Sequence, residues 1–264
     1  MFFQIFDSRH LMFLPCITVA VLLSWSADAT QGEAAAIERL QVMAEARASV
    51  VERTVATRGG LLSALRTLEP VPRAEGEVEE IISILQPYLK GGEPNWQLVL
   101  EGIRALKLEP HNEELTDLRE QILLLPYSEN LTQVERIIIP GVFRQLAFDA
   151  TEREIEILKT CAKAAASPEK CPYLRTSEDT PISTHDLEFT ARMAVSDYLR
   201  VAPASPNVLD FMEEVLDAYP EGSPILDMLN RNMRKAHDLA AGITEPYDSP
   251  PDCSIPEEIG VNSL

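Results

Sequence analysis

Three cysteines outside the N-terminal segment are the residues whose type and spacing could support covalent chemistry: Cys161, Cys171 and Cys253. The sequence has no C-x-x-C or C-x-x-C-H motif, so neither a thioredoxin-like redox pair nor covalent haem attachment is indicated. In an oxidising compartment Cys161 and Cys171 are natural partners, because Ser167-Pro168 must turn the chain between them. We therefore predict a Cys161–Cys171 disulfide, worth about 2–3 kcal/mol for a loop of about ten residues. The competing arrangement joins Cys253 to Cys161 or Cys171 and ties the C-terminal tail to the body.

Histidines and carboxylates give no comparable signal. His111, His185 and His237 are not spaced at i, i+4 on one helix, and H-E-x-x-H does not occur, so no zinc site is predicted. Nucleophile-elbow, phosphate-loop and dinucleotide-binding motifs are absent as well, and we predict no catalytic residue and no cofactor. Adjacent carboxylates are too common in this acidic chain to indicate an acid–base pair; they are Glu79-Glu80, Glu113-Glu114, Glu213-Glu214 and Glu257-Glu258.

The N-terminal segment predicts export. Arg9 precedes an apolar run over residues 11–25, and Ala27-Asp-Ala29 follows it. This order is typical of a signal peptide over residues 1–29 that is cleaved after Ala29. The alternative is an uncleaved membrane anchor, but the apolar run is shorter than the roughly twenty residues that span a bilayer. We therefore expect a periplasmic or secreted protein without stable membrane insertion, in which Asn130 is a glycosylation site only if the host is eukaryotic.

The charge balance limits the class of partner. The full chain has a formal net charge of −19, and removal of Asp7, Arg9 and Asp28 with the first 29 residues leaves −18. A nucleic-acid partner is excluded because phosphate binding needs clustered lysine and arginine. Adhesion to anionic lipid is disfavoured for the same reason. The acidity serves solubility in an extracytoplasmic space, or it attracts a basic protein partner.

Helical periodicity dominates residues 30–245, and no strand alternation is evident. We predict an all-α domain there, followed by a disordered, acidic and proline-rich tail over residues 246–264. A helix over residues 131–139 is expected to end before Pro140, and another over residues 76–86 before Pro87. Thr151 opens a capping box with Glu154. The expected buried stripes include Trp96, Val99, Leu100, Ile103 and Leu106; Leu115, Leu118, Ile122 and Leu125; Leu187, Ala191, Ala194, Val195 and Tyr198; and Leu209, Met212, Leu216 and Tyr219.

The helix starts recur at a fixed spacing. Pro94 and Asn112 are eighteen residues apart, as are Ser205 and Ser223, so two-helix units would repeat at about 34–36 residues. The run from Ala105 through Pro110 to Asn112 resembles the end of a tetratricopeptide repeat, and the run from Leu216 to Pro220 is similar to a second such ending. The match covers residues 75–125 and 185–243 and departs from the family at Gln86-Pro87, Leu98 and Gly102. The resemblance implies stacked helical hairpins, a TPR-like α-solenoid; an irregular helical domain is the alternative.

Two functions remain open from the sequence. Stacked hairpins supply an extended binding surface without catalytic groups, which favours an exported, non-enzymatic scaffold for a protein or peptide. The alternative is a helical extracytoplasmic hydrolase acting on a cell wall or glycan through a buried glutamate. Such an enzyme needs aromatic residues that stack on sugars, whereas Trp96 is the only tryptophan after residue 29 and is expected in packing. We therefore regard enzymatic activity as the weaker hypothesis.

Overall fold

The computed structural model describes residues 31–46, 76–89, 94–106, 109, 112–148, 150–201 and 207–241. The predicted signal peptide, the tail, His111 and Cys253 lie outside these residues. A helix spans residues 31–46, and the other helices are α3 (Glu77–Leu89), α4 (Trp96–Ala105), α5 (Glu113–Leu123), α6 (Gln133–Ala147), α7 (Glu152–Lys163), the short 3-10 helix η1 (Pro168–Lys170), α8 (Thr184–Val201), α9 (Asn207–Asp217) and α10 (Leu226–Ala240). The described part of the chain contains no strand, only an isolated bridge between Arg175 and Pro181. The predicted all-α class is confirmed.

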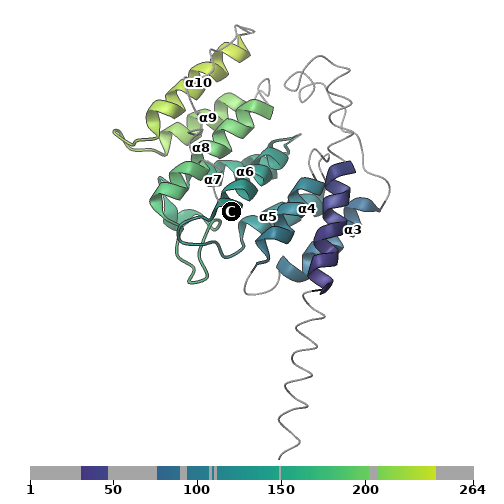
Figure 1. The fold of residues 1–264 in the computed structure, drawn as a ribbon. Helices are drawn as coiled ribbons and strands as arrows, with labels where there is room; N and C mark the ends of the chain where they lie inside the picture. Colours follow the sequence, from purple (N-terminus) through teal and green to yellow (C-terminus); the bar gives the residue numbers. More distant parts are fainter. Residues whose placement is uncertain are drawn as a thin grey trace, which may run out of the picture.

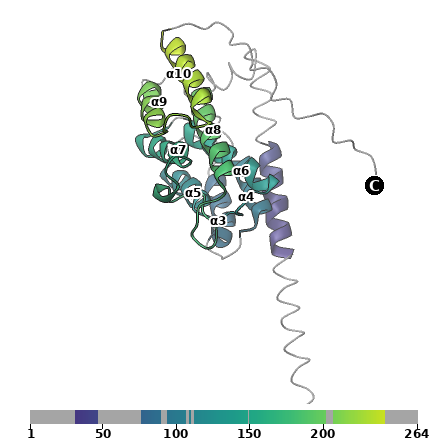
Figure 2. The ribbon, with the colours of Figure 1, turned by 90° about the vertical axis from the view of Figure 1, so that its left-hand side faces the viewer.

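The helices form two rows. Each helix from α3 to α10 packs against the next one along the chain, except α4 and α5, and many also pack against the next but one. The helices α4, α6, α8 and α10 contact one another in succession as one row, and the contacts α3–α5 and α7–α9 belong to the other. Successive pairs follow each other from α3–α4 to α9–α10 (Figures 1 and 2). Among the described helices, none has both the length and the apolar composition needed to cross a lipid bilayer.

The predicted buried stripes are confirmed on three helices and only in part on α9, where Met212 and, just after the helix, Tyr219 are buried as predicted. In α4, α5 and α8 the expected apolar positions lie in the core, with Trp96 half-buried at the start of α4. In α9 the core side chains are Val208, Phe211, Met212 and Val215, whereas Leu209 and Leu216 are only half-buried. Six of the eleven residues of this helix are apolar, so its contacts with α7, α8 and α10 decide which of them are buried.

Two prolines expected to end helices lie inside them. Helix α6 continues through Pro140 to Ala147, and α3 continues through Pro87 to Leu89. Proline removes one backbone hydrogen bond in a helix interior. Packing offsets this cost in α6, because Ile139 and Phe143 on either side of Pro140 are completely buried. Gly141 lets α6 approach α4 closely, since a Cβ there would lie 2.9 Å from the Cγ2 atom of Ile103.

A non-helical segment between α7 and α8 folds against the chain that follows α5. The backbone N–H of Leu174 donates to the carbonyl of Leu123 (3.0 Å), and the N–H of Tyr127 donates to the carbonyl of Arg175 (2.8 Å). We call residues 171–183 the pocket loop. Leu174 and Asp179 adopt positive φ angles of 59° and 58°, a left-handed conformation that non-glycine residues rarely adopt. Tertiary contacts therefore hold this loop in a strained shape next to α5.

Candidate binding surface on helix α5

Helix α5 presents one buried face and one exposed face. The side chain of Asn112 accepts a hydrogen bond from the N–H of Glu114 (2.8 Å) and caps the helix as predicted. Glu113 and Glu114 in the first turn complement the helix dipole and are exposed. At the other end Leu124 follows the helix and is 52 % exposed, which is unusual for a leucine in this structure. Each end of α5 borders a surface pocket.

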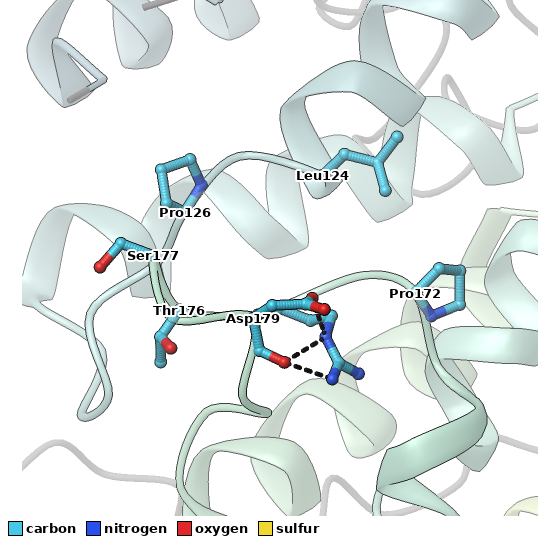
Figure 3. Close-up of a pocket in the computed structure, with 7 residues that line it drawn as sticks. Leu124, Pro126, Pro172, Thr176, Ser177 and Asp179 are labelled. Atoms are coloured by element: carbon cyan, nitrogen blue, oxygen red, sulfur yellow. Dashed lines mark hydrogen bonds and ion pairs between the residues drawn. The ribbon is translucent and has the colours of Figure 1, made fainter. Parts of the chain in front are cut away.

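The first pocket lies at the C-terminal end of α5 and encloses about 340 Å³. Leu124 and Pro126 form one side, and residues of the pocket loop face them (Figure 3). The Arg175 guanidinium is held there by the carboxylate of Asp179 (2.6 Å) and by the carbonyl of Cys171 (3.0 Å). The lining is therefore mixed, with three apolar side chains, two hydroxyl side chains and an arginine paired with an aspartate; its residues are Leu124, Pro126, Pro172, Arg175, Thr176, Ser177 and Asp179.

The second pocket lies where the N-termini of α5 and α7 meet, and it encloses about 330 Å³. Glu113, Glu152 and Arg153 form its rim, and Thr116 and Thr151 form the rest of its wall. Thr151 and Glu154 make the predicted capping box: the Glu154 carboxylate accepts from the N–H of Thr151 at 3.0 Å. This pocket carries two exposed glutamates, whereas the one charged pair in the first pocket is Arg175 with Asp179.

Glu120 connects the two pockets. Its carboxylate accepts from Arg153 of the second pocket (2.6 Å) and from the hydroxyl of Tyr173, which follows Pro172 of the first pocket (2.7 Å). Hydrogen bonds with Glu120 and Asp117 raise the pKa of the Arg153 guanidinium. Burial, followed by the hydrogen bond with Glu120, raises the pKa of Tyr173. Both groups therefore keep their protons at neutral pH, and we call the two pockets with Glu120 between them the α5 surface.

A buried ion pair supports the second pocket from beneath. Arg119 and Glu154 are completely buried, and their side chains pair at 3.4 Å. Glu154 also accepts from the Thr116 hydroxyl (2.8 Å), and Gln145 accepts from Arg119 (3.4 Å). Burial lowers the pKa of Arg119 to about 10 although Glu154 and Glu109 favour its charged form. We did not predict this cluster, yet the spacing could have indicated it, because Arg119 lies four residues after Leu115 and three before Ile122, within the buried stripe.

The exposed charge of the α5 surface is acidic. Its two arginines are paired with Asp117, Glu120 and Asp179. Glu113, Glu114 and Glu152 make no ion pair with any residue that the structure describes. Within the described ranges, Glu113 and Glu152 of the second pocket therefore have no cationic partner, and their charge would attract a lysine or arginine side chain.

The structure brings the two predicted disulfide partners together. Cys161 and Cys171 are both buried, and their thiols lie close enough to shift each other's pKa. Both are free thiols in this structure, so the predicted proximity is present and the covalent bond stays a prediction. His185 and His237 are exposed on α8 and α10, and in the described ranges no group of side chains could hold a metal ion.

Three of the buried glutamates, Glu101, Glu135 and Glu154, have structural roles. Glu135 completes a capping box with Thr132 at the start of α6, and Glu154 does the same in α7 while pairing with Arg119. Glu101 accepts hydrogen bonds from Gln97 (2.8 Å) and Arg104 (2.9 Å). Trp96 packs against Tyr127, with ring centroids 4.8 Å apart, as the packing interpretation of this tryptophan predicts. These contacts give the three carboxylates and the tryptophan roles in capping, ion pairing and packing.

Asp197 on α8 gives a prediction for pH dependence. Its carboxylate is completely buried beside Arg144 (3.2 Å) and Arg200 (3.9 Å), and its Oδ2 atom has no hydrogen-bond partner among the described residues. Burial outweighs the two arginines and raises the pKa of Asp197 above 3.8. The folded state then binds the proton more tightly than the unfolded state, so this group destabilises the fold at neutral pH. That penalty is relieved as the pH falls through the folded pKa toward 3.8.

Accordingly, we expect Asp197→Asn to be more favourable relative to wild type at pH 7 than at pH 4. The measurement is urea denaturation of both proteins at the two pH values, with Asp210→Asn on the exposed face of α9 as the control for charge removal. An equal free-energy difference at both pH values would show that Asp197 titrates alike in the folded and unfolded chains.

Comparisons with protein-family models, with curated proteins and with solved structures give no match for this chain.

Proposed function

We propose that this chain is an exported helical scaffold that binds a basic segment of a protein or peptide on the α5 surface. The observation that carries the proposal is a pocket with exposed glutamates at one end of α5 and a pocket walled in part by Leu124 and Pro126 at the other end. Glu113 and Glu152 offer negative charge to a lysine or arginine at one end. Leu124 and Pro126 offer apolar contact to an aliphatic or aromatic side chain at the other.

The spacing of the pockets limits the segment. Helix α5 has 11 residues, which corresponds to about 16 Å at 1.5 Å per residue. An extended peptide covers that distance with about five residues. We therefore propose a segment in which a basic residue and an apolar residue lie about five positions apart, with the basic residue over the N-terminal end of α5.

The arrangement of the helices supports a scaffold. The two rows of helices are compatible with stacked hairpins, the architecture that the resemblance to tetratricopeptide repeats implies. Such stacks bind extended partners through surface side chains and need no enclosed active site. The contacts of the buried glutamates support binding over hydrolysis, because each of Glu101, Glu135 and Glu154 serves a cap or an ion pair.

Fluorescence anisotropy with labelled peptides tests the proposal. The probe is a seven-residue peptide with lysines at one end and leucine at the other, and the reference peptide has glutamates in place of the lysines. We expect binding of the basic peptide only, with an affinity that falls as salt is added. Glu113→Lys with Glu152→Lys should weaken binding by roughly tenfold or more, since reversed charges in contact repel the ligand.

A matched control distinguishes binding at the second pocket from nonspecific attraction to the net negative charge of the protein. Asp210→Lys with Glu213→Lys makes the same charge change on the exposed face of α9. It should leave the affinity within about twofold of wild type, because exposed charges more than a Debye length away are screened. Equal losses in both double variants would show nonspecific attraction and overturn the proposed site.

A further inference from the structure

The thiol pair lies at the base of the pocket loop. Cys161 belongs to α7 and is completely buried, whereas Cys171 directly follows η1 and is 3 % exposed. The two thiols lie close enough to shift each other's pKa, and the Sγ atom of Cys171 donates a hydrogen bond to the carbonyl of Tyr173 (3.5 Å). Residues ten positions apart are thus already in contact, as a disulfide requires.

Cys171 is connected directly to the first pocket. The next residue, Pro172, forms part of the pocket wall. The carbonyl of Cys171 accepts a hydrogen bond from Arg175, which also lines the pocket (3.0 Å). A covalent bond at Cys171 would therefore fasten this wall of the pocket to α7.

The two thiols differ in reactivity. The neighbouring Cys161 thiol, together with the backbone of Tyr173 and the charge of Arg175, outweighs burial and lowers the pKa of Cys171. Burial raises the pKa of Cys161 well above its ordinary value. Since the thiolate is the nucleophile in disulfide exchange, Cys171 is the thiol that reacts first.

We propose that Cys171 and Cys161 form a disulfide in that order by exchange with an external disulfide, and that the bond fixes the pocket loop against α7. The Cys171 thiolate attacks one sulfur of the external disulfide, which gives a mixed disulfide and releases one thiolate. Cys161 then loses its proton and attacks the sulfur of Cys171, which releases the second thiolate. The two cysteines lose two electrons, the external disulfide gains them, and the two released thiolates take up the two cysteine protons.

The burial of Cys171 sets a condition on the first step. Its backbone N–H donates to the carbonyl of Pro168 (3.3 Å), which closes the turn over the thiol. The external disulfide can reach the sulfur only when this turn opens locally. Cys161 needs no such access, because its partner sulfur is already adjacent to it.

Peptide mapping of the full chain after incubation with oxidised glutathione tests the proposal. Trypsin places Cys161 on residues 160–163, Cys171 on residues 171–175 and Cys253 on a separate C-terminal peptide. After free thiols are blocked, we expect the first two peptides to be linked. Cys253→Ser should give the same linked pair, whereas a link that contains Cys253 would overturn the assignment.

Single variants test the order of attack. Cys161→Ser should accumulate glutathione on residues 171–175, because the second step is lost. Cys171→Ser should leave Cys161 unmodified over the same time. Glutathione trapped on Cys161 in the Cys171→Ser protein at the rate seen for Cys171 would contradict the proposed order.

Hydrogen exchange tests the effect on the loop. The amide of Leu174 is expected to exchange about tenfold more slowly after oxidation, because the bond removes local opening of the loop. Disulfide formation and slower exchange in the pocket loop do not depend on the proposed function. Only a change in peptide affinity after oxidation would rest on it. A linked peptide with unchanged exchange would reject the fixed loop, whereas a linked peptide without peptide binding would reject the proposed function alone.

Discussion

Glu154→Ala is expected to destabilise the protein by about 3–5 kcal/mol, because it leaves the Arg119 guanidinium buried without its principal partner. The same change removes the acceptor of the Thr116 hydroxyl and the carboxylate that caps α7. The charge of Glu109 also favours the charged form of Arg119, but burial already lowers the pKa of Arg119 to about 10. The loss is measured as the free energy of unfolding in urea at pH 7.

Glu135→Ala is the matched control for the capping function. Glu135 is also a completely buried glutamate that closes a capping box with a threonine, but it has no arginine partner among the described residues. Its loss should cost about 1–3 kcal/mol, the effect of a lost cap and of unpaired hydrogen-bond donors. If Glu154→Ala costs no more than Glu135→Ala, Arg119 does not depend on Glu154.

Glu156→Ala is the control for surface charge on the same helix. Glu156 is 65 % exposed and pairs with Lys159 at 3.3 Å. Exposed pairs of this kind contribute less than about 1 kcal/mol. The comparison separates the cost of an unpaired buried charge from that of any altered charge on α7.

Helical periodicity correctly predicts a helix and its buried face where contacts with other helices do not alter the preference of the local sequence. In α8 the residues at positions 187, 191, 194, 195 and 198 are all buried, since one apolar stripe leaves a single way to face the core. The capping signals at Asn112 and Thr151 are equally local, and both caps are present. These features follow from residues within one or two turns of each other.

The wrong predictions arise where a local energetic cost is offset by packing against distant parts of the chain. Pro140 costs α6 a hydrogen bond, and only contacts with distant helices show that this cost is offset. The stripe on α9 has the same origin, because Leu209 and Phe211 are both apolar and the fold selects Phe211. Sequence periodicity gives no measure of either tertiary gain.

The candidate site also contains one feature that the sequence predicts and one that it does not. The proximity of Cys161 and Cys171 was predictable because a short turn joins them. The first pocket was not, since it forms where the pocket loop meets Leu124 and Pro126, about fifty residues earlier in the chain. Backbone hydrogen bonds between these segments, such as that from Tyr127 to Arg175, are set by the packing of α5 and α7 and have no sequence motif.

Phe211→Ala is expected to cost about 3–5 kcal/mol and to loosen the C-terminal pair of helices more than the rest of the chain. Phe211 is 1 % exposed and packs against Tyr198 of α8, with ring centroids 4.6 Å apart. In a stack of hairpins each unit contacts only its neighbours, so stability is lost first where the cavity lies. Amide exchange should therefore rise more in α9 and α10 than in α4 and α6.

Leu209→Ala is the control on the same helix, because Leu209 is only half-buried and should cost clearly less than Phe211. Urea denaturation measures the total loss for both variants, and hydrogen exchange with mass spectrometry shows where it falls. An equal rise in exchange from α3 to α10 would mean that all helices open together. That result would contradict stacked hairpins and indicate a single cooperative helical domain, because a cavity at α9 would then weaken every element alike.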